Sequence, residues 1–396
     1  MKAGWDVKPL GDLLSVLKNG INCKQDKSGN GVKISRIESI SDATFNSERV
    51  GYADLSEAEK QRYCLKKGDI LFSHINSPVH VGKTAIFDCD EPIYHGVNLL
   101  LMRPTEKLLP EYLNFALKYL FQTGYWARTS KQSVNQASVN QKDISCVDIS
   151  YPTSKEEQHR IVAILNEAFE AISAARANAE QNRQNARALF ESYLQSVFSQ
   201  RGDGWVERSF SEVCEISSTL VDPRQDEYLE QLHIGGANIE AKTGKLLELR
   251  TAREENLISG KFIFDESMVL YSKIRPYLMK VVRPDFKGLC SADIYPLSPK
   301  SGVLDRNYLF HMLLSPQFTD YANAGSARAG MPKVNRGHLF SYRCFFPPIE
   351  QQIEFAASLD ALHEETQCLE SLYQRKIAAL DELKQSLLQQ AFSGQL

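Results

Sequence analysis

The apolar positions of the chain follow two different periods, and each period occurs twice. Residues 1–153 and 201–347 contain short β-branched or aromatic runs that are interrupted by Gly, Pro and Asn, as is typical of strands and turns. Residues 154–200 and 348–396 contain almost no Gly or Pro until their ends, and their apolar residues recur at helical spacing. The pattern predicts two mixed α+β globular domains that alternate with two long helices.

Individual elements are predicted within these segments. Ser154 can cap the first long helix by accepting a backbone N–H, and Pro348 suits the first turn of the second helix. Acidic residues follow both positions, as the positive end of a helix favours. The runs that most resemble strands are Asp69–Phe72, Thr84–Phe87, Phe262–Phe264 and Met268–Tyr271.

The two halves of the chain are also similar in sequence. Short identical or conservative segments recur in the same order at offsets of 193 to 200 residues, whereas chance matches would scatter. We therefore interpret the chain as two collinear copies with small differences in loop length. The matched segments are Gly4-Trp5 with Gly204-Trp205, Gly68–Ile75 with Ser267–Ile274, Tyr112-Leu113 with Tyr308-Leu309, Val139-Asn140 with Val334-Asn335, Glu157-Gln158 with Glu350-Gln351, and Phe198-Ser199 with Phe392-Ser393.

Each long helix carries a seam of residues with alternating spacings of three and four, the pattern of a coiled coil. The seams predict that the two helices, each roughly 60 Å long, pair with each other as an antiparallel coiled coil, which would make the repeat a pseudo-two-fold one and place the globular domains at opposite ends of the pair. The alternative is that each helix packs on its own globular domain. The seam residues are Ala168, Ile172, Ala175, Ala179, Asn182, Ala186, Leu189 and Tyr193, and then Leu359, Leu362, Thr366, Leu369, Tyr373, Lys376, Leu380, Leu383 and Leu387.

The composition is that of a folded protein, with 43% hydrophobic and 24% charged residues. No stretch approaches the length of a membrane span, and the first ten residues lack the apolar core of a signal peptide. The eight cysteines are scattered without a C-x-x-C pair, so we expect reduced and mostly buried thiols. These features predict a cytoplasmic protein with no membrane partner.

Four phrases resemble a known family when they are taken in order. They are Lys67–Ser73 (KGDILFS), Gln132–Ile144 (QSVNQASVNQKDI), Tyr151–Leu165 (YPTSKEEQHRIVAIL) and Phe346–Ile353 (FPPIEQQI). Together with the repeat, they resemble the specificity subunits of type I restriction-modification systems, in which two target-recognition domains alternate with two helical regions. The first copy has Pro-Thr-Ser where the family has Pro-Pro, and the second copy lacks the Gly-Asp pair.

The resemblance implies a function for each part. Each target-recognition domain would read half of an interrupted site in double-stranded DNA, and the helix pair would set the gap and bind two methyltransferase (modification) subunits. Restriction subunits would complete the cleaving complex, so this chain would be non-catalytic and would need no cofactor. Three alternatives stay open: a specificity module of another restriction or phage-defence methyltransferase, a coiled-coil adaptor that does not bind DNA, and a stand-alone enzyme.

Motifs that would indicate an enzyme fail on inspection. Gly82-Lys83-Thr84 ends like a phosphate-binding loop, but the required earlier glycine is Ser77, and Pro78 removes a backbone N–H. Pro347-Pro348 lacks the preceding Asn or Asp of an adenine methyltransferase, and the histidines show no metal-binding spacing. We expect His363, on the second long helix, to be exposed to solvent. The sequence therefore predicts no catalytic residue and no metal site.

Net charge does not indicate nucleic-acid binding, because the chain carries −3 at pH 7. DNA contact would need basic and amide side chains gathered on one face of each globular domain. In the first domain the candidates are His74, Asn76 and Lys83 after the predicted strand, and a polar run before the helix: Arg128, Lys131, Gln132, Asn135, Gln136, Asn140 and Gln141. In the second domain they are Lys273, Arg275, Lys280, Arg328, Lys333, Asn335 and Arg336. Simple surface solvation is the alternative for each residue.

Overall fold

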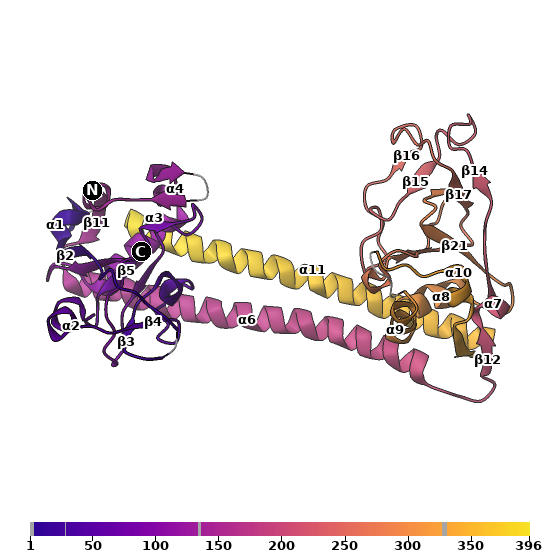
Figure 1. Cartoon of the computed structure of the whole chain (residues 1–396), viewed down its shortest axis with the longest axis horizontal. Coiled ribbons are helices and arrows are strands. Elements are labelled where there is room, and N and C mark those ends of the chain that lie inside the picture. Colours follow the sequence, from indigo (N-terminus) through magenta and orange to yellow (C-terminus); the bar gives the residue numbers. More distant parts are fainter. Residues whose placement is uncertain (1–3, 28, 134–135, 327–330) are drawn as a thin grey trace. The chain divides into compact units, whose positions relative to one another are not determined.

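The computed structural model describes residues 4–27, 29–133, 136–326 and 331–396. The chain forms two compact units, and each is described by itself. Unit 1 comprises Met1–Ala179 and Arg375–Leu396, and unit 2 comprises Glu180–Gln374. Each unit therefore contains one globular segment and a part of both long helices, α6 (Lys155–Ser199) and α11 (Ile349–Ser393) (Figure 1).

The globular segment of unit 1 is built around an antiparallel sheet with the strand order β2-β8-β5-β7. Smaller pairings are β1 with β11, β3 with β4, and the three-stranded sheet β6-β10-β9. The elements are β1 (Trp5–Pro9), α1 (Leu10–Leu13), β2 (Leu14–Asn19), β3 (Val32–Ile34), η1 (Ile37–Ile40), β4 (Gly51–Ala53), α2 (Glu57–Tyr63), β5 (Ile70–Phe72), β6 (Ile75–Asn76), β7 (Thr84–Ile86), β8 (Leu100–Pro104), α3 (Pro110–Gln122), α4 (Tyr125–Thr129), β9 (Lys131–Ser133), β10 (Gln136–Ser138), α5 (Gln141–Ser145) and β11 (Asp148–Pro152).

The globular segment of unit 2 repeats this arrangement. Its sheet β13-β21-β18-β19 has the equivalent order, and β12 pairs with β22 as β1 does with β11. A five-stranded sheet, β14-β17-β20-β15-β16, is added. The elements are β12 (Val206–Ser209), α7 (Phe210–Val213), β13 (Cys214–Ile216), β14 (Leu220–Val221), β15 (Leu232–Ile234), β16 (Arg250–Thr251), β17 (Lys261–Phe264), β18 (Val269–Ser272), η2 (Pro276–Leu278), β19 (Val281–Val282), β20 (Gly288–Cys290), β21 (Ile294–Pro299), α8 (Arg306–Leu313), α9 (Pro316–Ala324), α10 (Arg336–Phe340) and β22 (Arg343–Phe346).

The central strands β5 and β18 are buried along their whole length. Successive side chains of a strand point to opposite faces of the sheet. Ile70 and Phe72 join one apolar cluster and Leu71 joins another, so both faces of the sheet are covered. Tyr271 and Leu270 are divided between two clusters in the same way. This explains the continuous apolar runs, and all four predicted strands are confirmed to within one or two residues.

A buried glutamine joins the start of each long helix to the adjacent globular segment. In unit 1 the Gln158 side chain accepts a hydrogen bond from Leu109 N (2.8 Å) and donates to the carbonyls of Lys107 (3.0 Å) and Pro152 (2.9 Å). In unit 2 the Gln352 side chain accepts from Asp305 N (2.9 Å) and donates to the carbonyls of Val303 (3.0 Å) and Pro347 (2.9 Å). The same three backbone groups are thus satisfied in both copies.

These contacts correct one detail of the sequence match. Glu157-Gln158 had been matched with Glu350-Gln351, but the buried glutamines show that Gln158 is equivalent to Gln352. The helix starts also agree with the sequence. Ser154 accepts a hydrogen bond from Glu157 N (3.4 Å), and Pro348 directly precedes α11, one residue before the expected position.

The end of each helix packs in the unit that holds the start of the other helix. In unit 1, Phe392 of α11 lies against Tyr112 with ring centroids 5.3 Å apart. In unit 2, Phe198 of α6 lies against the equivalent Tyr308 at 5.0 Å. The phenylalanine and tyrosine matches found in the sequence are therefore the two sides of one repeated contact.

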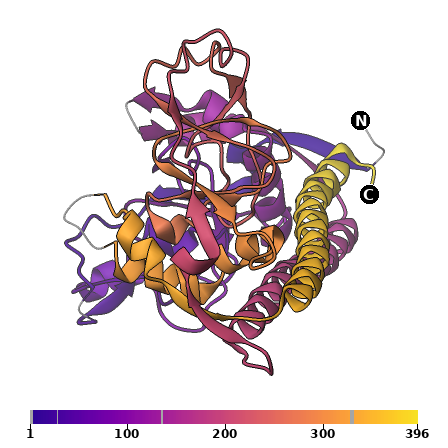
Figure 2. The ribbon, with the colours of Figure 1, turned by 90° about the vertical axis from the view of Figure 1, so that its right-hand side faces the viewer.

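Within each unit the two helices lie side by side and antiparallel (Figures 1 and 2). In unit 1, Ile161 and Leu165 of α6 share an apolar cluster with Leu388 and Ala391 of α11. Both clusters that contain helix residues also contain residues of the globular segment. The helices therefore pack on each other and on the globular segments, so the two alternatives left open by the sequence both occur.

The predicted seam is correct for part of each helix and wrong for the rest. Ile172, Ala179, Leu359 and Thr366 are buried as expected, whereas Asn182, Leu189, Lys376 and Leu383 are exposed. A straight helix has 3.6 residues per turn, so a strict heptad pattern drifts away from the interface. The residues that are buried instead are Phe190, Leu194, Val197, Ile377 and Leu388.

Two ion pairs join the helices. In both pairs the arginine is on α6 and the acidic residue is on α11, so positions that the repeat aligns carry opposite charges. Arg176 of α6 pairs with Asp381 of α11 at 3.4 Å in unit 1, and Arg187 of α6 pairs with Glu370 of α11 at 2.7 Å in unit 2. The repeat aligns Arg176 with Glu370 and Arg187 with Asp381. Pairing between two copies of the same helix in this register would therefore place like charges opposite each other, which favours pairing of α6 with α11.

Unit 2 has an additional polar contact between α11 and its globular segment. The carboxylate of Asp360 accepts hydrogen bonds from Arg283 (2.9 Å) and pairs with the buried His311 (2.7 Å). Burial opposes ionisation of Asp360, but His311 and Arg283 outweigh it and lower the pKa of Asp360 to about 2. His363 was expected to be exposed; it is instead half-buried and 3.0 Å from the Thr243 carbonyl oxygen.

The expectation of mostly buried cysteines is wrong. All eight are free thiols, but only Cys214 and Cys290 are buried, and Cys146 and Cys368 are exposed. No helix in the described part of the chain has the length and apolar character needed to cross a membrane.

Replacing Gln158 or Gln352 by leucine tests the buried hydrogen bonds. Each substitution leaves one buried N–H and two carbonyls without their partner, so we expect the free energy of unfolding of the full chain to fall by about 2–4 kcal/mol. Gln389 on the exposed face of α11 provides the control, because its replacement by leucine should change stability by less than about 0.5 kcal/mol. Equal effects of Gln389→Leu and Gln352→Leu in denaturant titrations would contradict this role.

Reversing charges tests the pairing of the helices. Asp381→Arg places two arginines together and should destabilise the chain by about 0.5–1 kcal/mol at low salt, because both side chains are about half exposed. Adding Arg176→Asp should restore most of the loss, since it recreates the pair in the opposite sense. A double variant no more stable than Asp381→Arg would show that the two side chains are not coupled.

Candidate nucleic-acid interface

In each unit the structure joins two segments that the sequence nominated separately. The segment after β5 pairs with β10, with Asn76 opposite Ala137 and Ile75 opposite Ser138. The segment after β18 likewise forms a bridge between Ile274 and Lys333. The polar run before each short helix therefore lies beside the loop that follows the central strand.

The same hydrogen bonds build this arrangement in both copies. Val139 N donates to His74 O and Val334 N donates to Lys273 O, both at 2.9 Å. The loops close where Ser73 N donates to Lys83 O (2.9 Å) and Ser272 N donates to Lys280 O (3.0 Å). We call residues 74–82 the first hairpin loop and residues 273–279 the second hairpin loop.

In unit 1 most of the polar run is exposed. Gln132 also donates through Nε2 to Ala127 O (2.9 Å), and Asn140 caps α5 by accepting from Asp143 N (2.8 Å). Lys131 and Gln132 lie on β9, which pairs with β10, and β10 in turn pairs with β6 of the first hairpin loop. The exposed candidates are Arg128, Lys131, Gln132, Gln136, Asn140 and Gln141.

Three further candidates of unit 1 that the structure describes are less exposed and make contacts within the protein. His74 is buried, and burial lowers its pKa, so it favours the neutral form. Asn76 donates through Nδ2 to Ser73 Oγ (3.1 Å), and Lys83 donates through Nζ to Ser41 O (2.7 Å). These contacts leave the polar run as the better-placed group.

In unit 2 the candidates form a cationic cluster. Arg275 and Arg336 are exposed, whereas only 12% of the Lys273 side chain is accessible. Burial, together with the nearby charge of Lys333, lowers the pKa of Lys273, and Asp293 at 3.4 Å partly offsets this effect. Unit 2 thus concentrates positive charge beside the second hairpin loop.

Two further unit 2 candidates have contacts of their own. Lys280 donates through Nζ to Gly236 O, and Asn335 caps α10 by accepting from His338 N (2.8 Å). Asn140 and Asn335 are therefore equivalent helix caps as well as candidate contacts. Asn135 and Arg328 lie outside the described residues.

Sequence reasoning missed the exposed apolar side chains of these loops. Val79 and Tyr277 are exposed on the first and second hairpin loops, and Met331 is exposed next to Lys333. The signal that could have found the first two is the proline that precedes each of them in the aligned copies.

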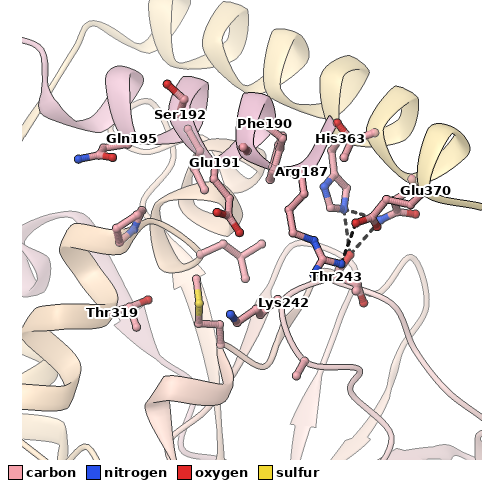
Figure 3. A pocket seen from close by; sticks show the side chains of 18 of the residues that line it. Arg187, Phe190, Glu191, Ser192, Gln195, Lys242, Thr243, Thr319, His363 and Glu370 are labelled. Carbon is pink, nitrogen blue, oxygen red and sulfur yellow. Dashed lines mark hydrogen bonds and ion pairs between the residues drawn. The ribbon is translucent and has the colours of Figure 1, made fainter. Parts of the chain in front are cut away.

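A pocket of about 590 Å³ lies in unit 2 between α6, α9, α11, the 241–243 loop and Met279 at the end of the second hairpin loop (Figure 3). In its lining Arg187 pairs with Glu370 at 2.7 Å, and His363 lies 3.0 Å from the Thr243 carbonyl oxygen. None of the nominated residues that the structure describes lines it. Within the described ranges, no group of three or more His, Cys, Asp or Glu residues could hold a metal ion.

The fold and the loops together define a class of protein: an internally repeated α+β protein with a pair of long antiparallel helices and equivalent polar loops in both copies. Residues 2–181 and 202–376 match the family described as type I restriction modification DNA specificity domain. The two matches include most of the chain, so the chain belongs to this family.

Individual relatives agree with the family. The chain is 42% identical over 166 residues to a putative type I restriction enzyme MjaX specificity subunit of Methanocaldococcus jannaschii, covering 41% of this chain and 39% of the relative. It is 34% identical over 194 residues to the EcoDI specificity subunit of Escherichia coli, covering 49% of this chain and 43% of the relative. The matches therefore span less than half of these curated relatives.

Two solved structures share the fold over the full chain. One comes from a study of complex assembly and conformational transition of the type I R-M system; it has a TM-score of 0.73 and 18% identity and covers 100% of this chain and 99% of its own. The other is the HsdS subunit from Thermoanaerobacter tengcongensis, with a TM-score of 0.60 and 18% identity, covering 100% of this chain and 98% of its own. The predicted fold class and family are confirmed.

The cap positions allow a test of the folding role of Asn140 and Asn335. Asn335→Ala removes the hydrogen bond to His338 N and should lower the free energy of unfolding by about 1 kcal/mol, whereas Asn335→Asp keeps an acceptor and should change it by only a few tenths. Asn140→Ala and Asn140→Asp should behave in the same way in unit 1. Equal stability of the alanine and aspartate variants in thermal or chemical unfolding would contradict the capping role.

Proposed function

We propose that this chain is the DNA-sequence specificity subunit of a type I restriction-modification enzyme. Each copy reads one half of an interrupted site in double-stranded DNA. The single observation that carries the proposal is the repeated pairing of a hairpin loop with a polar segment, with different side chains in the two copies. One chain can therefore present two different reading surfaces on the same backbone framework.

The chemistry of the exposed and half-exposed side chains supports DNA as the ligand. Lys131, Lys333 and Arg336 can neutralise phosphates, and the amides of Gln132 and Gln136 can both donate and accept hydrogen bonds at base edges. Phosphate contacts would provide affinity and base contacts would provide specificity. All seventeen nominated residues stay candidates at this level, and the exposed ones have priority.

The long helices account for the second part of the proposed function, which is to space the half-sites and to bind partner subunits. We assign to α6 and α11 the spacing of the two half-sites and the binding of methyltransferase subunits, two per chain, with a restriction subunit completing the complex. Methylation and cleavage then belong to these partners, and this chain is a non-catalytic, cytoplasmic protein without a cofactor. The proposed domain boundaries remain 1–153, 154–200, 201–347 and 348–396.

A binding selection tests the proposal. The full chain with its methyltransferase partner is offered random duplex DNA, and we expect enrichment of an asymmetric site with two specified parts and an unspecified gap. Enrichment of one continuous short site would contradict the two-part reading, and no enrichment would favour a coiled-coil adaptor without DNA binding.

Lengthening both helices by the same number of residues provides a second test, which uses the same binding selection. Seven residues inserted in α6 after Arg183 and in α11 before Gln374, which face each other at 3.4 Å, preserve the pairing. This adds about 10 Å and should widen the selected gap by about 3 base pairs, leaving both half-sites unchanged. An unchanged gap would contradict the spacing role, and insertion into one helix alone is the control that breaks the register.

A further inference from the structure

The tips of the two hairpin loops are built in the same way. In the first loop, His80 N donates to Ser77 O (2.9 Å) across Pro78-Val79. In the second loop, Leu278 N donates to Arg275 O (2.9 Å) across Pro276-Tyr277. Each tip is therefore a tight turn with proline at its second position and an apolar residue at its third.

Both apolar side chains project into solvent. Val79 is 70% exposed and Tyr277 is 49% exposed. A single exposed apolar side chain is ordinary on a protein surface. What distinguishes these two is that they occupy equivalent positions in the two copies, although the residues themselves differ.

The surroundings of the tips are polar and cationic. The second loop carries the exposed Arg275 next to the turn and is bridged to the segment of Lys333, which leads to Arg336. The first loop contains β6, which pairs with the strand of Gln136 and Ser138. The ligand that fits an apolar tip within such a surface is a polyanion with apolar groups of its own.

The second tip is also conformationally restrained. Arg275 (φ 50°) and Met279 (φ 48°) both adopt the left-handed conformation, which is unfavourable for residues with side chains. Arg275 N donates to Pro332 O (2.9 Å), which ties the strained turn to the neighbouring segment. Strain that the surrounding structure maintains is found at ligand-binding loops, and here it fixes the position of Tyr277.

We propose that Val79 and Tyr277 are specificity-determining residues that contact the C5-methyl group of thymine in the major groove, one in each half-site. The methyl groups of valine and the ring face of tyrosine make apolar contacts, and the thymine methyl is the apolar feature that the major groove presents. The different shapes of valine and tyrosine give the two half-sites different preferences. The inference rests on the proposed function, because it needs a chain that binds duplex DNA.

The experiment uses the full chain with its methyltransferase partner and duplexes of its selected site. In these probes each thymine in turn is replaced by deoxyuridine, which removes only the methyl group. We expect the wild-type chain to lose about fourfold in affinity at one thymine in each half-site. Val79→Ala should abolish that sensitivity in one half-site only, and Tyr277→Ala should abolish it in the other half-site only.

Matched controls exclude a general effect of removing exposed apolar surface. Val7→Ala in unit 1 and Ile258→Ala in unit 2 truncate side chains that are also exposed and lie outside the hairpin loops. They should leave uracil sensitivity unchanged in both half-sites. Unfolding midpoints of all variants should match the wild type, because none of these side chains is buried.

The outcomes separate the two proposals. If the wild-type chain enriches no interrupted site, the proposed function fails. If it does, and the alanine variants retain uracil sensitivity, lose it in both half-sites, or alter preference at a base pair without thymine, the assignment of Val79 and Tyr277 is overturned and the proposed function stands.

Discussion

Two buried glutamines set the arrangement within both units. Gln158 and Gln352 each satisfy one N–H and two carbonyls at the junction between a globular segment and the start of a long helix. A buried amide with three partners is costly to disrupt, so the direction in which each helix leaves its globular segment is fixed. The packing of Phe392 on Tyr112, and of Phe198 on Tyr308, then places the end of the other helix in the same unit.

On this shared framework the two copies differ in chemistry. In unit 2, Asp360 joins α11 to Arg283 and His311 through charged hydrogen bonds. In unit 1 the equivalent region is aromatic, with Phe115 and Phe169 rings 5.5 Å apart. The hairpin loops follow the same principle, because backbone hydrogen bonds are kept while the exposed side chains change. A repeat of this kind can vary its two binding surfaces without altering the fold.

The repeat, the strands and the long helices were predictable because each depends on local periodicity or on an alignment of the chain with itself. The exact seam was not, since Leu189 and Phe190 are both apolar and only the drift of the helix decides which is buried. The proximity of Asn76 to Ala137 was also not predictable, because strand pairing over this separation depends on tertiary packing. The apolar tips were overlooked because exposure cannot be read from a single residue.

The most direct test of the account is to locate each reading surface on DNA by proximity cleavage. With the six cysteines that are not buried replaced by serine (Cys23, Cys64, Cys89, Cys146, Cys344 and Cys368), a DNA-cleaving iron chelate is attached to a cysteine introduced as Gln132→Cys or as Lys333→Cys, and cleavage of the selected duplex is mapped. The account predicts cleavage centred in one half-site for Gln132→Cys and in the other for Lys333→Cys. Cleavage of the same half-site by both conjugates, or cleavage spread evenly over the duplex, would contradict it.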